Sequence, residues 1–311
     1  MNTLHEIMGQ INIDGMVLLN EPMSRHTTFE VGGPADLYIR PESSSDLQRA
    51  LGFLRAKHIP VTVIGGGANV VVSDAGIRGA VIDTTAVSAI SIEGTTVRVE
   101  SGAMISDAAE LTARSGLAGL EFLYSMPGTC GGAVWMNARC YGSSIDDVLE
   151  SVRYVDEHTE VRTLTAAHEE FAYKLSPFQL HDWTIIEAVF QLTPGNAEEL
   201  TERMREYYED RSVKGHFALP CAGSVFKNDR RFNAPSGKIL DELGVRGMRI
   251  GGAQVSTLHA NIIVNAGNAR AQDIRDLTDR LREMVEAARG WTLEPEILFI
   301  GDWESHPNTS N

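Results

Sequence analysis

The stretch Val61-Thr-Val-Ile-Gly-Gly-Gly-Ala-Asn-Val-Val-Val-Ser-Asp74 places three consecutive glycines between two runs rich in β-branched residues. This pattern predicts a strand, a tight turn and a second strand. Because glycine has no Cβ, its backbone reaches positive φ angles, and several N–H groups can then approach one anion. The stretch alone is therefore equally compatible with a diphosphate cradle and with an empty glycine-rich hairpin.

Two common phosphate-binding motifs do not match this stretch. Gly65, Gly67 and Val70 lack the third glycine of the dinucleotide fingerprint, and strand-like residues follow where that motif needs a helix. A P-loop would require a closing Gly-Lys-Ser or Gly-Lys-Thr, which is absent from the sequence here. A diphosphate cradle in this chain would therefore lie in a turn between strands.

The composition restricts the class of protein and the class of partner. The chain has 311 residues, enough for two or three domains, and 43% hydrophobic with 22% charged residues is usual for a soluble globular enzyme. The net charge of −15 would repel a polyphosphate backbone, so we expect no nucleic-acid partner. An anionic ligand must therefore meet a local group of basic residues.

The cysteines and the N-terminus indicate a cytoplasmic protein. The odd set Cys130, Cys140 and Cys221 shows no zinc-type spacing, so we expect reduced thiols and no metal site. His5, Glu6 and Asp14 argue against a signal peptide. No run approaches the roughly 18–20 apolar residues of a membrane span, so no membrane partner is expected.

Periodicity and turn signals predict alternating helices and strands. In the first half we expect a helix and a connector over residues 1–24, strands at Leu37–Ile39, Ala80–Asp83, Ala89–Ile92, Val97–Ser101, Val152–Asp156 and Ile185–Leu192, and helices from Ser44 or Ser45 to Lys57 and from Ser106 to Arg114. After a break at Pro194-Gly195-Asn196 we expect a charged helix to Lys214, strands at Ser224–Lys227, Asn261–Val264 and Ile297–Ile300, and helices at Lys238–Leu243 and Gln272–Ala288. The fold class is therefore α+β.

Short motifs along nearly the whole chain together resemble one family. They are Thr28-Phe29 with Gly32-Gly33-Pro34-Ala35, Gly65–Asn69, Gly119-Leu120-Glu121-Phe122, Pro127-Gly128-Thr129 with Gly131-Gly132-Ala133, Met136-Asn137-Ala138 with Tyr141-Gly142, Gly223–Asn228, and His259-Ala260-Asn261 with Val264-Asn265. With these motifs in this order, the chain resembles the UDP-N-acetylenolpyruvoylglucosamine reductases, bacterial cell-wall flavoenzymes. The short interval between Ser224 and Glu296 resembles the shorter subtype of that family.

The resemblance implies the domain organisation. It implies a vanillyl-alcohol-oxidase or PCMH-type FAD-binding fold of two subdomains, followed by a C-terminal α+β substrate domain. The first subdomain covers 1–82 and is completed by 295–311, and the second covers 83–209. The PCMH-type region spans about 30–194, and the substrate domain covers 210–294. We take the break near Pro194 as the main boundary signal in the sequence.

The resemblance also implies the cofactor and the reaction. It implies reduction of the enolpyruvyl ether of UDP-N-acetylglucosamine to UDP-N-acetylmuramate, a peptidoglycan precursor, with FAD as cofactor and NADPH as co-substrate. Ala68 and Asn69 stand in the turn where related oxidases often carry a flavin-linked histidine, so we expect FAD to be non-covalent. The implied cofactor-binding residues are Gly65, Gly66, Gly67, Ala68, Asn69, Pro127, Gly128, Thr129, Gly131, Gly132, Asn137 and Gly142.

Three residues carry the catalytic role that the resemblance implies. Ser224 matches the family's serine acid, and Glu296 matches its active-site glutamate. The reaction needs such groups, because the developing carbanion must be stabilised and then protonated. Without the resemblance, Ser224 reads as a turn or strand serine and Glu296 as a surface carboxylate, a role that fits Glu294 better. Lys174 stands where the family has an arginine for the enolpyruvyl carboxylate, so the charge is kept and the two-point fork is lost.

Two further residues differ from the family pattern. Four residues are expected to bind the substrate. Arg139 replaces a small residue, and we hypothesise that it restores charge near the flavin; Leu298 replaces a common arginine. The implied substrate-binding residues are Lys214, Lys227, Asn228 and Arg139. For Lys214 the alternative is an ordinary surface lysine, because Gly215-His216 replaces the family's Gln-Pro after it.

Two other functions remain compatible with the sequence. One is a different FAD oxidoreductase on the same fold, and the other is a non-catalytic paralogue that binds flavin or a UDP-sugar. Only the departures at Arg139, Lys174 and Leu298 favour the latter. From the shorter subtype we expect a monomer or a weak dimer.

Overall fold

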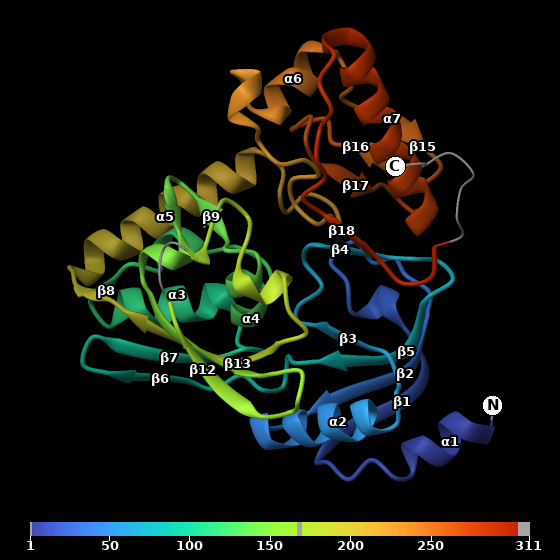
Figure 1. Ribbon diagram of the computed structural model, residues 1–311. Helices are drawn as coiled ribbons and strands as arrows, with labels where there is room; N and C mark the ends of the chain where they lie inside the picture. Colours follow the sequence, from blue (N-terminus) through green and yellow to red (C-terminus); the bar gives the residue numbers. More distant parts are fainter. Residues whose placement is uncertain (1, 167–169, 304–311) are drawn as a thin grey trace. The chain divides into compact units, whose positions relative to one another are not determined.

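The computed structural model describes residues 2–166 and 170–303. The last part of the predicted 295–311 segment, residues 304–311, lies outside the described residues. The chain forms two compact units, each built from separate stretches of sequence (Figure 1). The first comprises Met1–Leu19, Leu37–Gly66 and Gly79–Asp210; the second comprises Asn20–Asp36, Gly67–Arg78 and Arg211–Asn311. The division falls inside the glycine turn, between Gly66 and Gly67.

The chain forms a four-stranded sheet of order β1-β2-β5-β3. Its strands are β1 (Gly15–Pro22), β2 (Pro34–Pro41), β5 (Ile77–Asp83) and β3 (Val61–Ile64), and β3 pairs parallel with β5. Helix α2 (Ser44–Ala56) connects β2 to β3, and the Ser43 hydroxyl accepts a hydrogen bond from the backbone N–H of Asp46, capping its first turn. Leu47, Leu51 and Leu54 of α2 are buried in the core of this layer.

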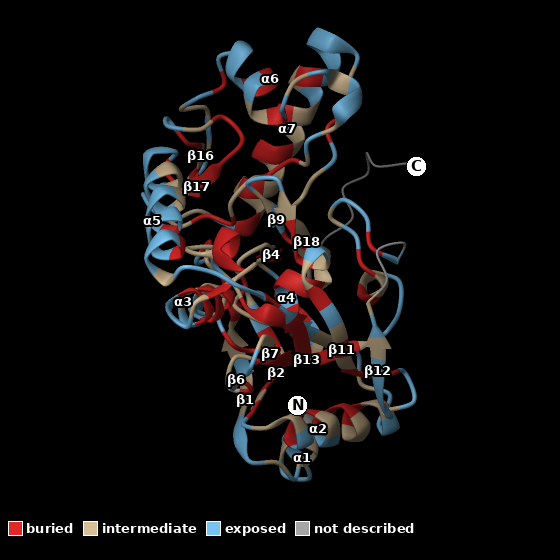
Figure 2. Cartoon of the chain, turned by 90° about the vertical axis from the view of Figure 1, so that its left-hand side faces the viewer, coloured by how far each residue is buried: buried red, intermediate tan, exposed pale blue. Residues whose placement is uncertain are grey.

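The first unit also contains a five-stranded sheet of order β12-β11-β13-β7-β6. The strands are β6 (Ile90–Glu93), β7 (Thr96–Glu100), β11 (Leu149–Val155), β12 (Val161–Thr165) and β13 (Thr184–Gln191), all antiparallel to their neighbours. Helices α3 (Ile105–Arg114) and α4 (Cys130–Trp135) lie on one face (Figures 1 and 2). Figure 2 shows this interior as buried, and Val97 and Val99 contribute alternate residues to it.

The remaining elements of the first unit are short or peripheral. They are α1 (Asn2–Met8), β8 (Leu117–Ala118), β9 (Arg139–Cys140), β10 (Ser143–Ser144), β14 (Thr193–Pro194), the 3-10 turns η2 (Glu121–Leu123), η3 (Ile145–Asp147) and η5 (Pro177–Gln179), and most of α5 (Ala197–Val213).

The second unit packs two helices around a small antiparallel sheet. The sheet contains β15 (Arg249–Ile250), β16 (Ala253–Val255) and β17 (Ile263–Asn265), and the helices are α6 (Ser236–Glu242) and α7 (Ala271–Arg289). The 3-10 turns η1 (Met23–Arg25) and η6 (Arg230–Phe232) complete it. Strand β4 (Val70–Val72), which leaves the glycine turn, pairs parallel with the late strand β18 (Leu298–Ile300). The predicted closing strand therefore lies beside the strand that follows the glycine turn.

Four local predictions were wrong. The connector before residue 24 contains β1, and β12 was not predicted. Residues 224–227 form no regular strand; they make single bridges at Ser224 and Phe226. The predicted helix Gln272–Ala288 was expected to carry an apolar stripe as far as Ala288, but Ala288 is exposed and the last buried residue of α7 is Val285.

The helices can also be compared with the length and hydrophobicity of a membrane span. Within residues 2–166 and 170–303, no helix is both long enough and apolar enough to cross a membrane.

Candidate active site

In the first unit, the start of the glycine turn lies directly against the start of α4. A Cβ built on Gly65 would lie 2.1 Å from the Thr129 hydroxyl, and one on Gly66 would lie 3.1 Å from the Cα of Gly128. Gly131 is equally constrained, since its Cβ would lie 2.9 Å from the Ser101 side chain. The glycines therefore allow two main-chain segments, far apart in sequence, to approach more closely than side chains permit.

Several polar groups of these segments have no protein partner. Within the described part of the chain, the backbone N–H groups of Gly65, Gly66, Gly128 and Thr129 donate no hydrogen bond. The hydroxyls of Ser101 and Thr129 are buried and lack partners among the same residues. Buried polar groups are normally satisfied, so this concentration of unused donors indicates a place where a ligand accepts them.

The side chain of Asn137 links two main-chain segments through hydrogen bonds. It is buried, its Nδ2 donates to the Ala172 carbonyl at 2.9 Å, and its Oδ1 accepts the N–H of Asp146 at 3.3 Å. Ala172 belongs to the turn that carries Lys174. The amide groups of Asn137 are therefore used by the protein, and its predicted contact with the cofactor stays a prediction.

Lys174 lies in a tight turn with φ +59°, a conformation uncommon for a residue with a side chain. Ala172 and Leu175 close the turn with reciprocal backbone hydrogen bonds of 3.0 and 3.1 Å. Gln179 Nε2 donates to the Lys174 carbonyl at 3.1 Å and to the Trp135 carbonyl at 2.7 Å. The Lys174 turn is thus fixed to the segment that leads from α4 to Arg139.

Arg139 is exposed on β9, which pairs with β10 in a two-residue ladder. The following Tyr141 stacks on Tyr207 of α5 with ring centroids 3.9 Å apart, and its hydroxyl donates to Asp210 at 2.9 Å. Gly142 is exposed with φ +88°, and nothing lies within 4 Å of a Cβ built on it. The Arg139–Gly142 loop is therefore held by α5.

In the second unit, the end of the glycine turn contacts the predicted catalytic glutamate. Gly67 has φ +60° and a Cβ there would lie 2.0 Å from the His26 carbonyl oxygen, so only glycine fits. Asn69 Nδ2 donates to the main-chain carbonyl of Glu296 at 3.0 Å. The Asn69 carbonyl accepts the N–H of Leu298 at 2.9 Å. The end of the glycine turn is therefore joined to the Glu296 segment by two hydrogen bonds.

Ser224 lies beside this segment. The N–H of Glu296 donates to the carbonyl of Val225 at 2.7 Å, so the residue after Ser224 is bonded to Glu296. Ser224 and Glu296 are both partly exposed, while Val225 is buried. The structure thus places the two predicted catalytic residues on adjoining stretches of main chain.

The two residues after the catalytic segment have protein partners here. Lys227 Nζ forms an ion pair with Glu294 at 2.5 Å, and the Asn228 Oδ1 accepts the N–H of Ser236 at 2.9 Å, at the start of α6. Glu294, whose side chain is 70% exposed, thus fits the surface role that the sequence suggested for it. Substrate binding by Lys227 and Asn228 stays a prediction.

Lys214 lies near His259 and Arg246 in the second unit. The positive charges of Lys214 and Arg246 act on the imidazole of His259. The centroid of the His259 ring lies 6.3 Å from that of His216. Burial and these two positive charges lower the pKa of His259, against the opposing effect of Asp241. His259 Nδ1 accepts the N–H of Asn261 at 3.2 Å, as a neutral ring can. Lys214 and Arg246 thus bring positive charge close to His259, and the charge of Arg246 is paired with that of Asp241.

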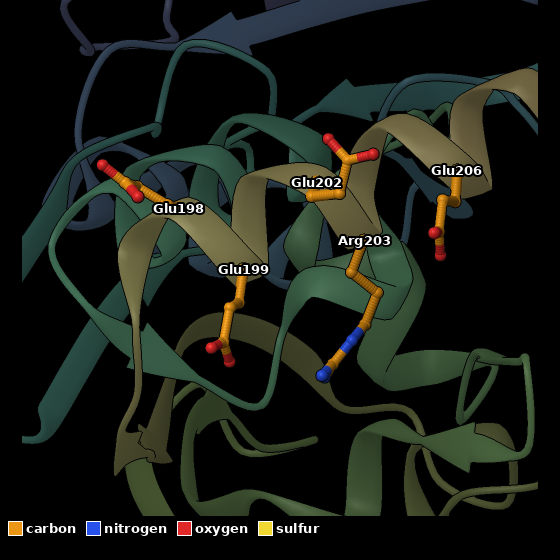
Figure 3. Close-up of a pocket in the computed structure, with 5 residues that line it drawn as sticks. All are labelled: Glu198, Glu199, Glu202, Arg203 and Glu206. Carbon is orange, nitrogen blue, oxygen red and sulfur yellow. The ribbon is translucent and has the colours of Figure 1, made fainter.

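A pocket on α5 does not fit the expected ligands. It is lined by Glu198, Glu199, Glu202, Arg203 and Glu206 (Figure 3). The Arg203 guanidinium is already paired with the carboxylate of Glu121 at 2.8 Å. Four carboxylates would repel a nucleotide or an enolpyruvyl carboxylate, so this pocket is not a candidate active site.

Sequence reasoning missed two contributors to the site. Asn261 was recognised only as part of a motif, and its side chain bonds both main-chain polar groups of Phe226. Tyr207, whose ring stacks on that of Tyr141, lies in none of the motifs named from the sequence. Neither partner is close in sequence, so the local pattern contained no signal for these contacts.

The residues of the first unit fit a diphosphate-containing cofactor such as FAD. The close approach at Gly65 and Gly66, the unused N–H groups and the buried Thr129 hydroxyl together supply donors for phosphate oxygens. No histidine occurs in the glycine turn, which fits a cofactor held without a covalent bond. For a metal, by contrast, no group of three or more His, Cys, Asp or Glu ligands lies together in the described ranges.

Comparisons with known proteins agree with this reading. The model of the FAD binding domain matches residues 35–165, and that of the UDP-N-acetylenolpyruvoylglucosamine reductase C-terminal domain matches residues 215–300. A UDP-N-acetylenolpyruvoylglucosamine reductase of Treponema denticola is 37% identical over 97% of this chain and 100% of its own. One from Caldanaerobacter subterraneus subsp. tengcongensis is 38% identical over 93% of this chain and 95% of its own.

A solved structure extends the match to the fold. The UDP-N-acetylenolpyruvylglucosamine reductase of Thermus caldophilus superposes with a TM-score of 0.78 at 29% identity, over 93% of this chain and all of that one. The predicted α+β class with an FAD-binding domain is confirmed. The chain belongs to the UDP-N-acetylenolpyruvoylglucosamine reductase family of FAD-binding oxidoreductases.

Proposed function

We propose that this protein reduces the enolpyruvyl ether of UDP-N-acetylglucosamine to the lactyl ether, giving UDP-N-acetylmuramate for peptidoglycan synthesis. The observation that carries the proposal is the 2.7 Å hydrogen bond from the N–H of Glu296 to the carbonyl of Val225, which holds the main chain next to Ser224 against Glu296. The substrate class follows from the names of the relatives, and NADPH as co-substrate follows from the family resemblance.

The proposed roles follow from what each side chain can do. Bound FAD supplies hydride transfer, and Ser224 gives its hydroxyl proton to the carbon that becomes the lactyl centre. Glu296 lies beside it as the carboxylate that orients the group or returns the proton. Lys174, with Arg139 on the neighbouring loop, binds the substrate carboxylate through charge.

The remaining contacts bind the cofactor and the nucleotide. Gly65, Gly66, Gly128 and Thr129 hold the FAD diphosphate through N–H and hydroxyl donors. Gly67, Ala68, Pro127, Gly131, Gly132 and Gly142 complete the cofactor-binding set. Lys214, whose charge lies close to His259, binds the diphosphate of the UDP-sugar, with Lys227 and Asn228 as further nucleotide contacts.

The division of labour along the chain is part of the same proposal. Residues 1–82 with 295–311 and residues 83–209 form the two FAD-binding subdomains, and residues 210–294 bind the substrate. The parallel pairing of β4 with β18 supports the return of the C-terminal segment to the first subdomain. Preference for NADPH, a monomeric or weakly dimeric state and a cytoplasmic location stay predictions.

Product formation by wild type and by Ser224→Ala tests the proposal. With NADPH and the enolpyruvyl UDP-sugar, the wild type should give a product heavier by two hydrogens in mass spectrometry. Ser224→Ala should accept electrons from NADPH at the wild-type rate and form product at least ~100-fold more slowly. Ser91→Ala, an exposed serine on β6, should behave as wild type.

Three outcomes would contradict the proposal in different ways. Normal product formation by Ser224→Ala would remove Ser224 from its role. Reduction by NADPH without product in the wild type would indicate a different electron acceptor. A wild-type protein purified without any flavin would favour the non-catalytic alternative.

A further inference from the structure

The main chain around Ser224 is held by individual hydrogen bonds and by no regular strand. Ser224 bridges Ile262, and Phe226 bridges Pro295, each as an isolated pair. A ladder of several pairs fixes a backbone cooperatively, whereas isolated bridges leave its position to a few contacts. The residues that supply these contacts therefore determine where the Ser224 hydroxyl lies.

Asn261 supplies most of the contacts on one side. Its carbonyl accepts the N–H of Val225 at 2.8 Å, its Oδ1 accepts the N–H of Phe226 at 3.0 Å, and its Nδ2 donates to the Phe226 carbonyl at 2.9 Å. Asn261 is 3% exposed and Phe226 1% exposed. Its side-chain amide thus replaces a strand partner for the residues that follow Ser224.

Asn69 supplies the corresponding contact for Glu296. Its side-chain amide donates to the Glu296 carbonyl, and its main-chain carbonyl accepts the N–H of Leu298. These two bonds lie on either side of Ile297, immediately before the β4–β18 ladder begins at Val70 and Leu298. Asn69 therefore extends that ladder to Glu296, where strand pairing itself has ended.

The two held segments are joined to each other. The N–H of Glu296 donates to the Val225 carbonyl at 2.7 Å. A continuous series of bonds therefore runs from Asn69 through Glu296 and Val225 to Asn261. Both asparagine amides bond main-chain groups, and neither is bonded to the Ser224 hydroxyl or the Glu296 carboxylate.

We infer that Asn69 and Asn261 are positioning residues that set the placement of Glu296 and Ser224 for proton delivery. This inference rests on the proposed function and gives Asn69 a role other than the cofactor contact predicted from the sequence. Proton transfer requires heavy atoms within hydrogen-bond reach, and a displacement of about 1 Å costs on the order of 100-fold in rate. Loss of either amide should therefore slow the proton-dependent step and spare reduction by NADPH.

Rapid-mixing measurements of the two half-reactions test this inference in the flavin-loaded protein. We expect Asn69→Ala to be reduced by NADPH within about twofold of the wild-type rate and to be reoxidised by the enolpyruvyl UDP-sugar roughly 10- to 100-fold more slowly. Asn69→Asp keeps the shape and removes the donor, so it should be as slow as Asn69→Ala. A folded Asn261→Ser variant should show the same selective loss.

Asn265→Ala is the matched control. The Asn265 side chain also joins main-chain groups of the second unit, donating to the Phe29 carbonyl and accepting the N–H groups of Gly267 and Ala269. This variant should lower thermal stability and leave both half-reaction rates within about twofold. Hydrogen exchange of the apoprotein gives an independent readout: the amides of Glu296 and Leu298 should exchange faster in Asn69→Ala and not in Asn265→Ala.

Several results would overturn the inference. If Asn69→Ala loses its FAD, or slows both half-reactions equally, Asn69 acts on the cofactor. If reoxidation is unchanged in Asn69→Ala or in a folded Asn261→Ser, that amide has no positioning role. If the wild type is reduced and never reoxidised by this substrate, the proposed function itself is wrong, and the inference falls with it.

Discussion

Lys174 combines an unusual residue with an unusual backbone. The family resemblance places an arginine there, and the structure places a lysine at φ +59° in a turn tied to Trp135 through Gln179. A lysine offers a point charge on a flexible stem, where an arginine offers a planar fork. These bonds use the main chain of residue 174 and not its side chain, so they do not depend on which of the two residues is present.

Substitution of Lys174 tests its role as a carboxylate ligand. Lys174→Met removes the charge and should raise the KM for the enolpyruvyl substrate roughly 10- to 100-fold, since a charged hydrogen bond contributes about 1.5–3 kcal/mol. Lys174→Arg restores the fork and should not raise KM. Steady-state kinetics at saturating NADPH measures both; an unchanged KM in Lys174→Met would exclude the role.

The lowered pKa of His259 predicts a pH dependence of stability. Because its pKa is lower folded than unfolded, the unfolded chain takes up the proton first as the pH falls below about 6.5. The contribution of His259 is therefore fully present above that pH and is lost below it. Between pH 7 and pH 5 the wild type should lose more thermal stability than His259→Gln.

Exposed His158 provides the control for this pH experiment. Its side chain is 77% exposed, so His158→Gln should follow the wild-type profile. Parallel curves for wild type and His259→Gln would show that the environment of His259 does not affect its titration.

Residue-scale roles were predictable only where a motif carries them. Ser224 and Glu296 lie in recognisable motifs, and the structure brings their segments together. The bond from Asn69 to Glu296 spans 227 positions, and no local pattern encodes a partner at that separation. An asparagine whose side chain replaces a strand partner cannot be distinguished by sequence from one that contacts a ligand.

Among the elements, the glycine turn was predicted correctly as strand, turn and strand. The sequence did not show that its strands separate: β3 pairs with β5 and β4 pairs with β18, so the stretch is no hairpin. Both partners are parallel strands reached by long connections, which turn chemistry alone cannot specify. Strand β12 is a different case: it pairs antiparallel with the neighbouring β11, and most of its residues are exposed, so it gave little hydrophobic signal.

Substitution of Gly65 tests whether the close approach of the glycine turn to Thr129 is needed to bind the cofactor. In Gly65→Ala the new Cβ would meet the buried Thr129 hydroxyl at 2.1 Å, so Thr129 must shift. We expect the variant to purify with less than about a tenth of the wild-type FAD, since a loss of ~1.4 kcal/mol already lowers affinity tenfold. Gly9→Ala, whose nearest atoms lie at 3.8 Å, should retain its FAD; full FAD content in Gly65→Ala would contradict the account.

Helix α7 depends on a side chain from the end of β4. The carboxylate of Asp74 accepts the N–H groups of Ala271 and Gln272 at 3.0 and 3.1 Å, where unpaired donors and the helix dipole favour a negative charge. Asp74→Ala should lower the free energy of unfolding by about 1–2 kcal/mol in urea titrations. The mid-helix variant Asp279→Ala, at a half-exposed side chain paired with Arg282, should change it by less than about 0.5 kcal/mol; equal effects would argue against the capping role.

At the scale of the whole molecule, the candidate residues are divided between the two units. Gly65, Thr129 and Lys174 belong to the first unit, and Ser224 and Glu296 belong to the second. The sequence could predict the family and the fold class because its motifs recur in order along the chain. It could not predict that each unit would be assembled from three separate stretches, since this depends on long-range strand pairing.

Anaerobic reoxidation of the reduced protein tests the central claim most directly. The purified protein should be yellow from non-covalent FAD, and NADPH should bleach it. One equivalent of the enolpyruvyl UDP-sugar should then restore the colour and yield UDP-N-acetylmuramate. Flavin that stays bleached after the sugar is added would contradict the proposed reaction.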